Sequence, residues 1–236
     1  PVLGVSKRVL SYTRPVYSDS AVDYTATGTI RSKTRSRKIK ENVTRVSHPA
    51  PFWEAKAVVG DEITTLSLND YENKFLVMVF YPFDFTFVCP TELLAFSDRL
   101  EEFQAINTEV VGISCDSEHS HFAWSKLPRK LGGIENIRIP LVADYSKKIT
   151  EEYNVLFEEK GIPLRATVII DDKGIVRVIN INDTEIGRSV DEVLRLVKAI
   201  QFANKHGEVC PVNWKEGDAT IVPDQKKSKE YFSSMN

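Results

Sequence analysis

The stretch FYPFDFTFVCPTE, residues 80–92, is expected to join a buried strand to a helix, with one thiol at the junction. Residues 75–81 form an apolar run of β-branched and aromatic side chains, which is typical of a buried strand. Proline is favoured in the first turn of a helix because its missing N–H would have no partner there, so Pro90 predicts that a helix begins close to it. Cys89 is therefore predicted to lie at a helix N-terminus.

A thiol at such a position has two possible fates. Unpaired backbone N–H groups and the positive end of the helix dipole favour an anion, so a cysteine there tends to be reactive as a thiolate. A free cysteine can equally serve as a small buried hydrophobic residue. The local pattern leaves both interpretations open for Cys89.

The surrounding chain alternates strands with helices. Further apolar runs predict strands at Val110–Ser114, Ile139–Ala143, Ala166–Ile170 and Ile175–Ile181. Apolar residues spaced three and four apart predict helices that contain Leu93, Phe96, Leu100 and Phe103, and Val190, Val193, Val197 and Ile200. The turn Asp171–Gly174 predicts a hairpin between the last two strands. We expect one α/β domain over residues 47–205, with a mixed central sheet and helices on both faces.

Residues 1–46 differ in charge from the rest of the chain. They carry ten Lys and Arg residues against three acidic ones, whereas the remainder carries 21 basic and 30 acidic residues. The segment is also rich in Ser and Thr and has no sustained apolar period, so it cannot bury enough surface to offset its chain entropy. This composition is the signature of a disordered organelle transit peptide, and we expect mitochondrial residence. A solvated basic tail or nucleic-acid arm, on a protein of the cytoplasm or another organelle, is the alternative.

The composition also excludes two classes of protein. Three cysteines in 236 residues are too few, and odd in number, for a secreted scaffold held by disulfides. No run of about 18 consecutive apolar residues occurs, which excludes a membrane-spanning helix. We therefore expect neither a membrane nor, beyond the leader alternative, a nucleic acid among the partners.

The spacing around the thiol is specific. The pattern Pro82-x-x-x-Thr86-x-x-Cys89, followed by Pro90-Thr91-Glu92, strongly resembles the active-site motif of the peroxiredoxins. The resemblance covers residues 50 to 232, and its other segments are Asp116–His119, Ala123–Trp124, Pro128–Lys130, Ile139–Leu141, Leu164–Arg165, Ile169–Asp171 and Gly187–Ser189. It implies a thioredoxin-like fold and a thiol-dependent peroxidase acting on hydrogen peroxide and organic hydroperoxides, with no cofactor and no metal.

The resemblance also implies a role for each residue of the motif. Cys89 would be the peroxidatic nucleophile, and attack of its thiolate on the O–O bond would give a sulfenic acid. Thr86 would orient the peroxide oxygens. Pro82 would shield the sulfur from water, in dry apolar surroundings provided by residues 83–88.

Charge develops on the departing oxygen during this attack, so the site needs a cation as well as a thiolate. By resemblance, Arg165 supplies that cation and helps to position the substrate. Glu92 would hold Arg165 or Arg188 in place rather than act as an acid or base.

A second block, Gly207–Trp214, looks like the resolving-cysteine segment of the typical two-cysteine peroxiredoxins. Residues 206–236 are polar and end in a short charged stretch, which predicts an extended arm with a small terminal helix and suits an exposed, mobile thiol. By resemblance, Cys210 of one subunit pairs with Cys89 of the other, so a homodimer is part of the mechanism. Such dimers commonly associate into decameric rings of five. Thioredoxin is the expected reductant.

Other features leave alternatives open. Cys115, expected to be a buried bystander, forms Cys-x-x-x-His-x-His with His119 and His121, a spacing that a metal site could use. Glu135 stands where overoxidation-sensitive peroxiredoxins carry the last glycine of Gly-Gly-Leu-Gly, whereas Tyr231-Phe232 matches the other half of that signature. A ring-forming chaperone and a relay that oxidises a client protein are the alternative functions.

Overall fold

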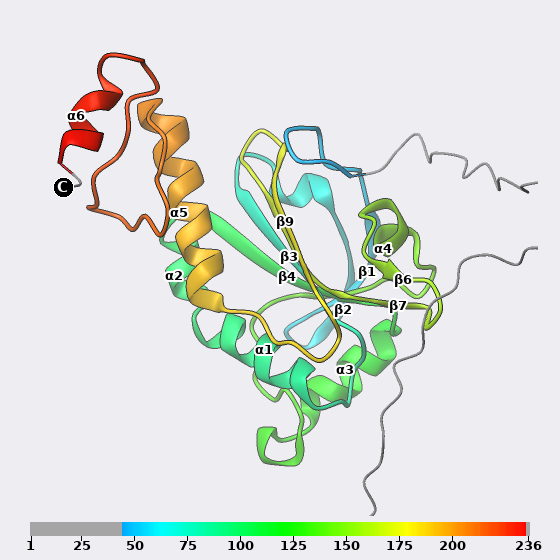
Figure 1. Cartoon of the computed structure of the whole chain (residues 1–236). Coiled ribbons are helices and arrows are strands. Elements are labelled where there is room, and N and C mark those ends of the chain that lie inside the picture. Colours follow the sequence, from blue (N-terminus) through cyan, green and yellow to red (C-terminus); the bar gives the residue numbers. More distant parts are fainter. Residues whose placement is uncertain (1–43, 235–236) are drawn as a thin grey trace, which may run out of the picture. The chain divides into compact units, whose positions relative to one another are not determined.

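The computed structural model describes residues 44–234, so the predicted leader, residues 1–46, lies outside the described residues except for its last three. Seven strands form one sheet in the order β2-β1-β5-β4-β3-β8-β9 (Figure 1). Their bounds are Glu54–Val59 (β1), Glu62–Ser67 (β2), Phe75–Phe80 (β3), Thr108–Ser114 (β4), Leu141–Ala143 (β5), Arg165–Ile170 (β8) and Val176–Asn182 (β9). Two short strands, Leu156–Phe157 (β6) and Ile162–Pro163 (β7), pair separately. β3 is parallel to β4 and antiparallel to β8, so the sheet is mixed, as predicted.

Helices cover both faces of this sheet. Their bounds are Val88–Asp98 (α1), Leu100–Gln104 (α2), Glu118–Lys126 (α3), Lys148–Glu152 (α4), Val190–His206 (α5) and Ser228–Ser233 (α6), with 3-10 turns at Leu68–Tyr71 and Arg129–Leu131. Side chains of α1, α2, α3 and α5 share one hydrophobic core, and those of α4 belong to a second core. The thioredoxin-like arrangement is therefore the one that the sequence predicted.

β3 lies near the middle of the sheet, and all of its residues are buried. Successive side chains of a strand point to opposite faces, so β3 contributes to both cores. Val77 and Val79 pack in the core that contains α1 and α5, whereas Leu76 and Met78 pack in the other core. This double burial explains the continuous apolar run that precedes Pro82 in the sequence.

The predicted strands and the hairpin turn are present, but the first predicted helix is interrupted. Its apolar spacing runs from Leu93 to Phe103, yet the chain breaks at Arg99 into α1 and α2. The Arg99 guanidinium binds Glu102 in the new turn and Asp191 at the start of α5. The break therefore starts a short second helix while the apolar side chains of both helices remain in one core.

The chain after α5 folds back along this helix. α5 ends at His206, one residue beyond the predicted boundary, and Gly207 caps it in the left-handed region with φ of +68°. Val209 and Ile221 then form an isolated bridge that closes the loop between them, and α6 follows (Figure 1). Among residues 44–234, no helix is long and apolar enough to cross a membrane.

Candidate active site

Cys89 is the second residue of α1, directly after the loop that leaves β3. The helix begins at Val88, so the predicted position of the thiol at a helix N-terminus is confirmed. The residue is fully buried, with no solvent-exposed surface. A peroxide can therefore reach the sulfur only when side chains around it move.

The preceding loop holds the first two residues of the motif. Pro82 is buried and lies two residues after the end of β3. The Thr86 hydroxyl is partly exposed and donates a hydrogen bond to the Phe83 carbonyl at 2.9 Å. Because its proton is used in this bond, the Thr86 oxygen keeps lone pairs that can accept further hydrogen bonds.

Arg165 brings a cation to the sulfur. It is the first residue of β8, the antiparallel neighbour of β3, and it is 4% exposed. Its Nη1 lies 3.4 Å from Cys89 Sγ and 2.7 Å from Glu92 Oε2, and its Nε donates to the Thr184 carbonyl at 2.6 Å. The guanidinium is thus fixed on both sides and directed at the thiol.

Glu92 holds both arginines, where the sequence predicted one or the other. It lies one helical turn after Cys89, and Arg188 binds both of its carboxylate oxygens, through Nε at 2.8 Å and Nη2 at 2.9 Å. The Arg188 backbone N–H adds a third bond at 2.8 Å, and its Nη1 donates to the carbonyls of Phe80 and Ala166. These bonds tie α1 to β3, β8 and the segment before α5.

Glu92 is a carboxylate at neutral pH. Burial acts to raise its pKa, but the hydrogen bonds and charge of Arg188, together with the charge of Arg165, outweigh burial and hold the pKa below its ordinary value. The buried cluster therefore contains two guanidinium groups and one carboxylate. A thiolate at Cys89 would bring its net charge to zero.

The aromatic residues of the loop were expected to enclose the site, but they do not. Phe83, Phe85 and Phe87 are 44%, 54% and 90% exposed, so residues 83–88 do not form a dry cover around Cys89 within one chain. The loop leaves the sheet as a tight turn, with Phe85 in the left-handed region at φ of +54°. Along this turn the exposed phenylalanines alternate with less exposed residues. The sulfur is instead buried in the core between the helices and the sheet.

A polar cluster that the sequence did not reveal anchors the centre of the same loop. Asp84 is buried and accepts hydrogen bonds from Tyr81 Oη at 2.9 Å and Ser120 Oγ at 2.8 Å. His121 Nδ1 lies 2.9 Å from Asp84 Oδ2, the oxygen that also accepts from Ser120, and the Asp84 backbone N–H donates to Asp116 at 3.0 Å. No signal in the sequence indicates this cluster, because a charged side chain between two phenylalanines is normally expected to be solvated.

Cys210 does not lie beside Cys89 within the chain. It sits on the arm after α5, partly exposed, and its Sγ contacts the Ala199 carbonyl at 3.6 Å. Cys89, Cys115 and Cys210 are all free thiols in this structure. Any bond between the two proposed redox cysteines therefore requires rearrangement or a second chain.

The suggested metal ligands are separated. Cys115 contacts the Thr150 hydroxyl, His119 is exposed on α3, and His121 is buried against Asp84. Burial raises the pKa of Cys115 to about 11, which keeps it a thiol at neutral pH. Within the part of the chain that the structure describes, no group of three or more His, Cys, Asp or Glu side chains is placed to hold a metal ion.

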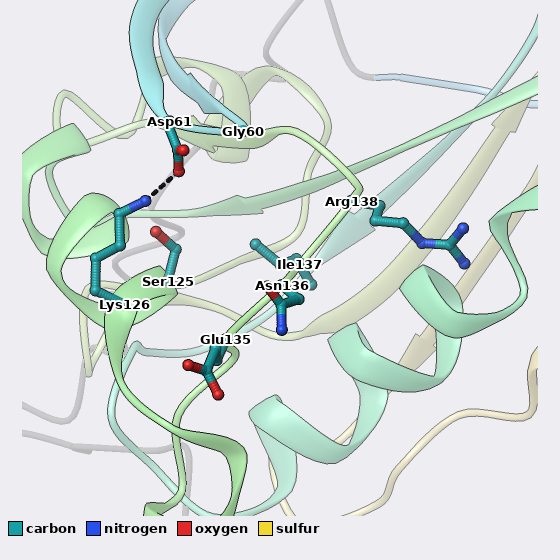
Figure 2. A pocket seen from close by; sticks show the side chains of 8 residues that line it. All are labelled: Gly60, Asp61, Ser125, Lys126, Glu135, Asn136, Ile137 and Arg138. Atoms are coloured by element: carbon teal, nitrogen blue, oxygen red, sulfur yellow. Dashed lines mark hydrogen bonds and ion pairs between the residues drawn. The ribbon is translucent and has the colours of Figure 1, made fainter.

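A surface hollow of about 540 Å³ lies elsewhere on the fold. Figure 2 shows its lining, which comes from the β1–β2 turn, the end of α3 and the segment before β5, with the Asp61–Lys126 ion pair at one side. It shares no residue with the cluster around Cys89. The hollow therefore contributes nothing to the candidate active site.

Comparisons with known proteins agree with this geometry. The model of the AhpC/TSA family matches residues 46–179, and the model described as the C-terminal domain of 1-Cys peroxiredoxin matches residues 199–234. Human peroxiredoxin-4 is 55% identical over 192 residues, which cover 81% of this chain and 71% of that protein. A Drosophila melanogaster protein named thioredoxin-dependent peroxide reductase, mitochondrial, is 54% identical over 80% of this chain and 82% of its own.

A solved structure shows the same fold. The reduced 2-Cys peroxiredoxin of Plasmodium vivax superimposes with a TM-score of 0.78 and is 44% identical, covering 80% of this chain and 99% of its own. The chain belongs to the AhpC/TSA family of peroxiredoxins, enzymes that reduce peroxides through a cysteine thiol.

Proposed function

We propose that Cys89 is the peroxidatic nucleophile of a two-cysteine peroxiredoxin and that Arg165 and Thr86 serve it directly. The observation that carries this proposal is the buried cluster of Arg165, Arg188 and Glu92, in which two guanidinium charges share one carboxylate. A buried charge is costly unless it is compensated. The sulfur of Cys89, 3.4 Å from Arg165 Nη1, is placed to compensate it as a thiolate.

The chemistry follows from these positions. The Cys89 thiolate attacks one oxygen of the peroxide, the O–O bond breaks, and the sulfur becomes a sulfenic acid while the other oxygen leaves as an alkoxide or hydroxide that takes up a proton. Arg165 stabilises the charge that develops on the departing oxygen. The Thr86 oxygen is free to accept a hydrogen bond, so it orients the peroxide by accepting from the peroxide O–H group. Buried Pro82 keeps water from the sulfur.

The sulfenic acid is then captured by Cys210. Condensation of the sulfenic acid with the Cys210 thiol forms a disulfide and releases water. Because Cys89 is buried in the first turn of α1, this turn must open before the two sulfurs meet. The separation of the two thiols in one chain supports pairing between the subunits of a homodimer, and five such dimers would complete a decameric ring.

Thioredoxin is the proposed reductant, and the mitochondrion the proposed compartment. A dithiol protein reduces such a disulfide by thiolate exchange through a mixed disulfide. The mitochondrial proposal is supported by the basic composition of residues 1–46 and by the similarity to the Drosophila protein named above. A fusion of residues 1–46 to a fluorescent reporter that remained in the cytosol would contradict it.

Two cysteine variants test the cycle. We expect Cys89→Ser to abolish peroxide consumption and Cys210→Ser to abolish steady thioredoxin-coupled turnover while the first oxidation of Cys89 remains. The measurements are peroxide loss in a single-turnover assay and NADPH oxidation in a coupled assay with thioredoxin and its reductase. Unchanged turnover in Cys210→Ser would replace the two-cysteine cycle by a one-cysteine mechanism, the type named in the description of the second family model.

A further inference from the structure

The arm that carries Cys210 is docked on one stripe of α5 (Figure 1). Arg195, Ala199 and Phe202 are spaced four and three apart, so they lie along the same side of the helix. Arg195 Nη1 donates to the Trp214 carbonyl at 3.2 Å, and the rings of Phe202 and Trp214 lie 5.0 Å apart. Cys210 lies between Phe202 and Trp214 in the sequence, and its Sγ contacts the Ala199 carbonyl at 3.6 Å. We call Arg195, Ala199 and Phe202 the arm cradle.

The residues on both sides of the contact between the arm cradle and the arm are held firmly. The Arg195 guanidinium is bound by both carboxylate oxygens of Glu192, at 2.6 and 2.7 Å, which leaves Nη1 directed at the arm. Trp214 is 2% exposed, and its Nε1 donates to the Asp218 carbonyl at 3.2 Å. An aromatic side chain that buries its ring and satisfies its N–H makes a specific packing contact. The arm therefore has a defined docked position.

The docked position keeps Cys210 protonated. A carbonyl oxygen accepts hydrogen bonds and cannot donate them, so the contact with Ala199 requires an S–H donor. Burial raises the pKa of Cys210, and the charge of Arg195 lowers it to a smaller extent, so that the pKa lies above its ordinary value. Because the thiolate is the reactive form of a cysteine, docked Cys210 is a poor nucleophile and a poor target for oxidation.

We propose that Arg195 and Phe202 are positioning residues for the resolving step, which hold Cys210 on α5 as a masked thiol until the arm is released. This inference rests on the proposed role of Cys210 in resolution. Masking would direct the first oxidation to Cys89, since the second thiol is withheld from peroxide. Release of the arm would then supply the thiol to the sulfenic acid of the partner subunit.

Alkylation of Cys210 tests the arm cradle directly. The reduced full-length chain is labelled with iodoacetamide from about pH 6 to about pH 10, a range that spans the ordinary cysteine pKa of about 8.5. Labelling is quantified for each cysteine by peptide mass spectrometry. We expect Phe202→Ala and Arg195→Gln to lower the midpoint for Cys210 and to speed labelling at neutral pH, by about tenfold for each unit that the midpoint falls.

Two matched variants serve as controls. Lys198→Gln removes an ion pair between α5 and the arm, but Lys198 and Glu216 are 40% and 74% exposed, so the arm should stay docked. Phe202→Tyr keeps the ring against Trp214 and is expected to retain the wild-type midpoint. If Lys198→Gln speeded labelling as much as Phe202→Ala, the effect would be a general loosening of the arm and the proposed cradle would be wrong.

The decisive outcomes are distinct for each residue. An unchanged midpoint in both Phe202→Ala and Arg195→Gln would overturn the proposal. A higher midpoint in Arg195→Gln alone would show that Arg195 acts through its charge and not as an anchor. Should Phe202→Ala fail to fold by circular dichroism, Arg195→Gln remains a test because its side chain is partly exposed. Oxidation of Cys89 by peroxide, followed in the same samples, reports the proposed function separately.

Discussion

Glu92 is the residue on which the geometry of the active site depends. It binds Arg165 and Arg188 together, and all three side chains are almost completely buried. Removing one partner of a buried ion pair costs more than the pair contributes, because the remaining charge is left without compensation. The carboxylate therefore sets the position of the guanidinium that faces Cys89 and also supports the fold.

Replacing Glu92 with Gln should destabilise the protein in a pH-dependent manner. We expect the free energy of unfolding to fall by about 3–5 kcal/mol at pH 7, the usual cost of breaking a buried pair. The folded-state pKa of Glu92 is lowered, so its contribution is complete above the ordinary carboxylate pKa of about 4.3 and is lost as the pH falls through the lower folded value. Urea unfolding of both proteins at neutral and acidic pH measures this.

The control is Glu101→Gln, which removes the exposed carboxylate that binds Arg138. Exposed ion pairs contribute little, so this variant should unfold like the wild type at neutral pH. A difference between wild type and Glu92→Gln that stayed constant down to strongly acidic pH would show that the lost contact is not that of a carboxylate.

Arg165 should contribute to catalysis through both its charge and its shape. We expect Arg165→Gln to reduce the rate constant for the reaction of Cys89 with hydrogen peroxide by about 10²–10³-fold, the usual loss when one charge-stabilising donor is removed. Arg165→Lys keeps the charge but cannot make the same forked contacts, so its rate should lie between the two. Stopped-flow fluorescence measures the rate, and equal rates for Lys and Gln would contradict a role for the charge.

At the scale of whole elements, the sequence predicted the centre of the sheet better than its edge. β3 and β8 are buried along their whole length, so they read as continuous apolar runs. β1 and β2 form the edge hairpin and contain several exposed polar residues, so no such run marks them. Trp124 was expected on a helix, but no apolar period marked the bounds of α3, since its buried residues include His121 and Ser125, which hydropathy counts as polar.

The same reasoning explains which parts of the site were predictable. The motif residues and Arg165 were found through the peroxiredoxin resemblance, whereas the contact of Arg165 with Cys89 depends on β8 lying next to β3, a long-range pairing that periodicity does not specify. Asp84 was missed because, apart from Tyr81, its partners Asp116, Ser120 and His121 lie 32 to 37 residues further along the chain. Exposure of the loop phenylalanines was missed because apolar side chains are normally expected inside.

The loop between α3 and β5 gives a prediction for one turn. A Cβ atom at Gly133 would lie 2.0 Å from the backbone oxygen of Leu127, so the backbone would have to shift. We expect Gly133→Ala to lower the free energy of unfolding by about 1–3 kcal/mol, as is usual for overpacking. Glu135 is exposed, and Glu135→Ala should change stability by less than about 0.5 kcal/mol. Urea unfolding compares them, and equal effects would contradict a steric role for Gly133.

This turn also supports the active-site loop. Trp124 donates from Nε1 to the Gly132 carbonyl at 3.0 Å, and its ring lies 5.9 Å from that of Phe85. Glu135 occupies the last position of the overoxidation signature without a steric conflict, because its side chain points into solvent. The departure from glycine at this position is thus compatible with the turn, and any effect on overoxidation would arise through what the loop contacts in the assembled enzyme.

At the scale of the whole molecule, the three thiols have different environments that suit different roles. Cys89 lies beside a guanidinium, and Cys210 is held on a helix by the arm. Cys115 was expected to be buried but is only half-buried, and its pKa is raised to about 11. These environments support the proposal that Cys89 is the site of oxidation and Cys210 the reserve thiol. The two proposed redox thiols are separate within the chain, so the assembly determines how they meet.

Mixing two variants tests whether Cys89 pairs with Cys210 of the partner subunit. Cys89→Ser lacks the nucleophile and Cys210→Ser lacks the resolving thiol, so neither alone should form a disulfide-linked dimer after a peroxide pulse. A mixture of the reduced variants, once subunits have exchanged, places one Cys89 opposite one Cys210 and should form linked dimers on a non-reducing gel. Cys115→Ser should behave like the wild type. If the wild type instead stayed monomeric on the gel with both thiols blocked to alkylation, the pairing would occur within one chain, and the arm would have to cross to its own active site.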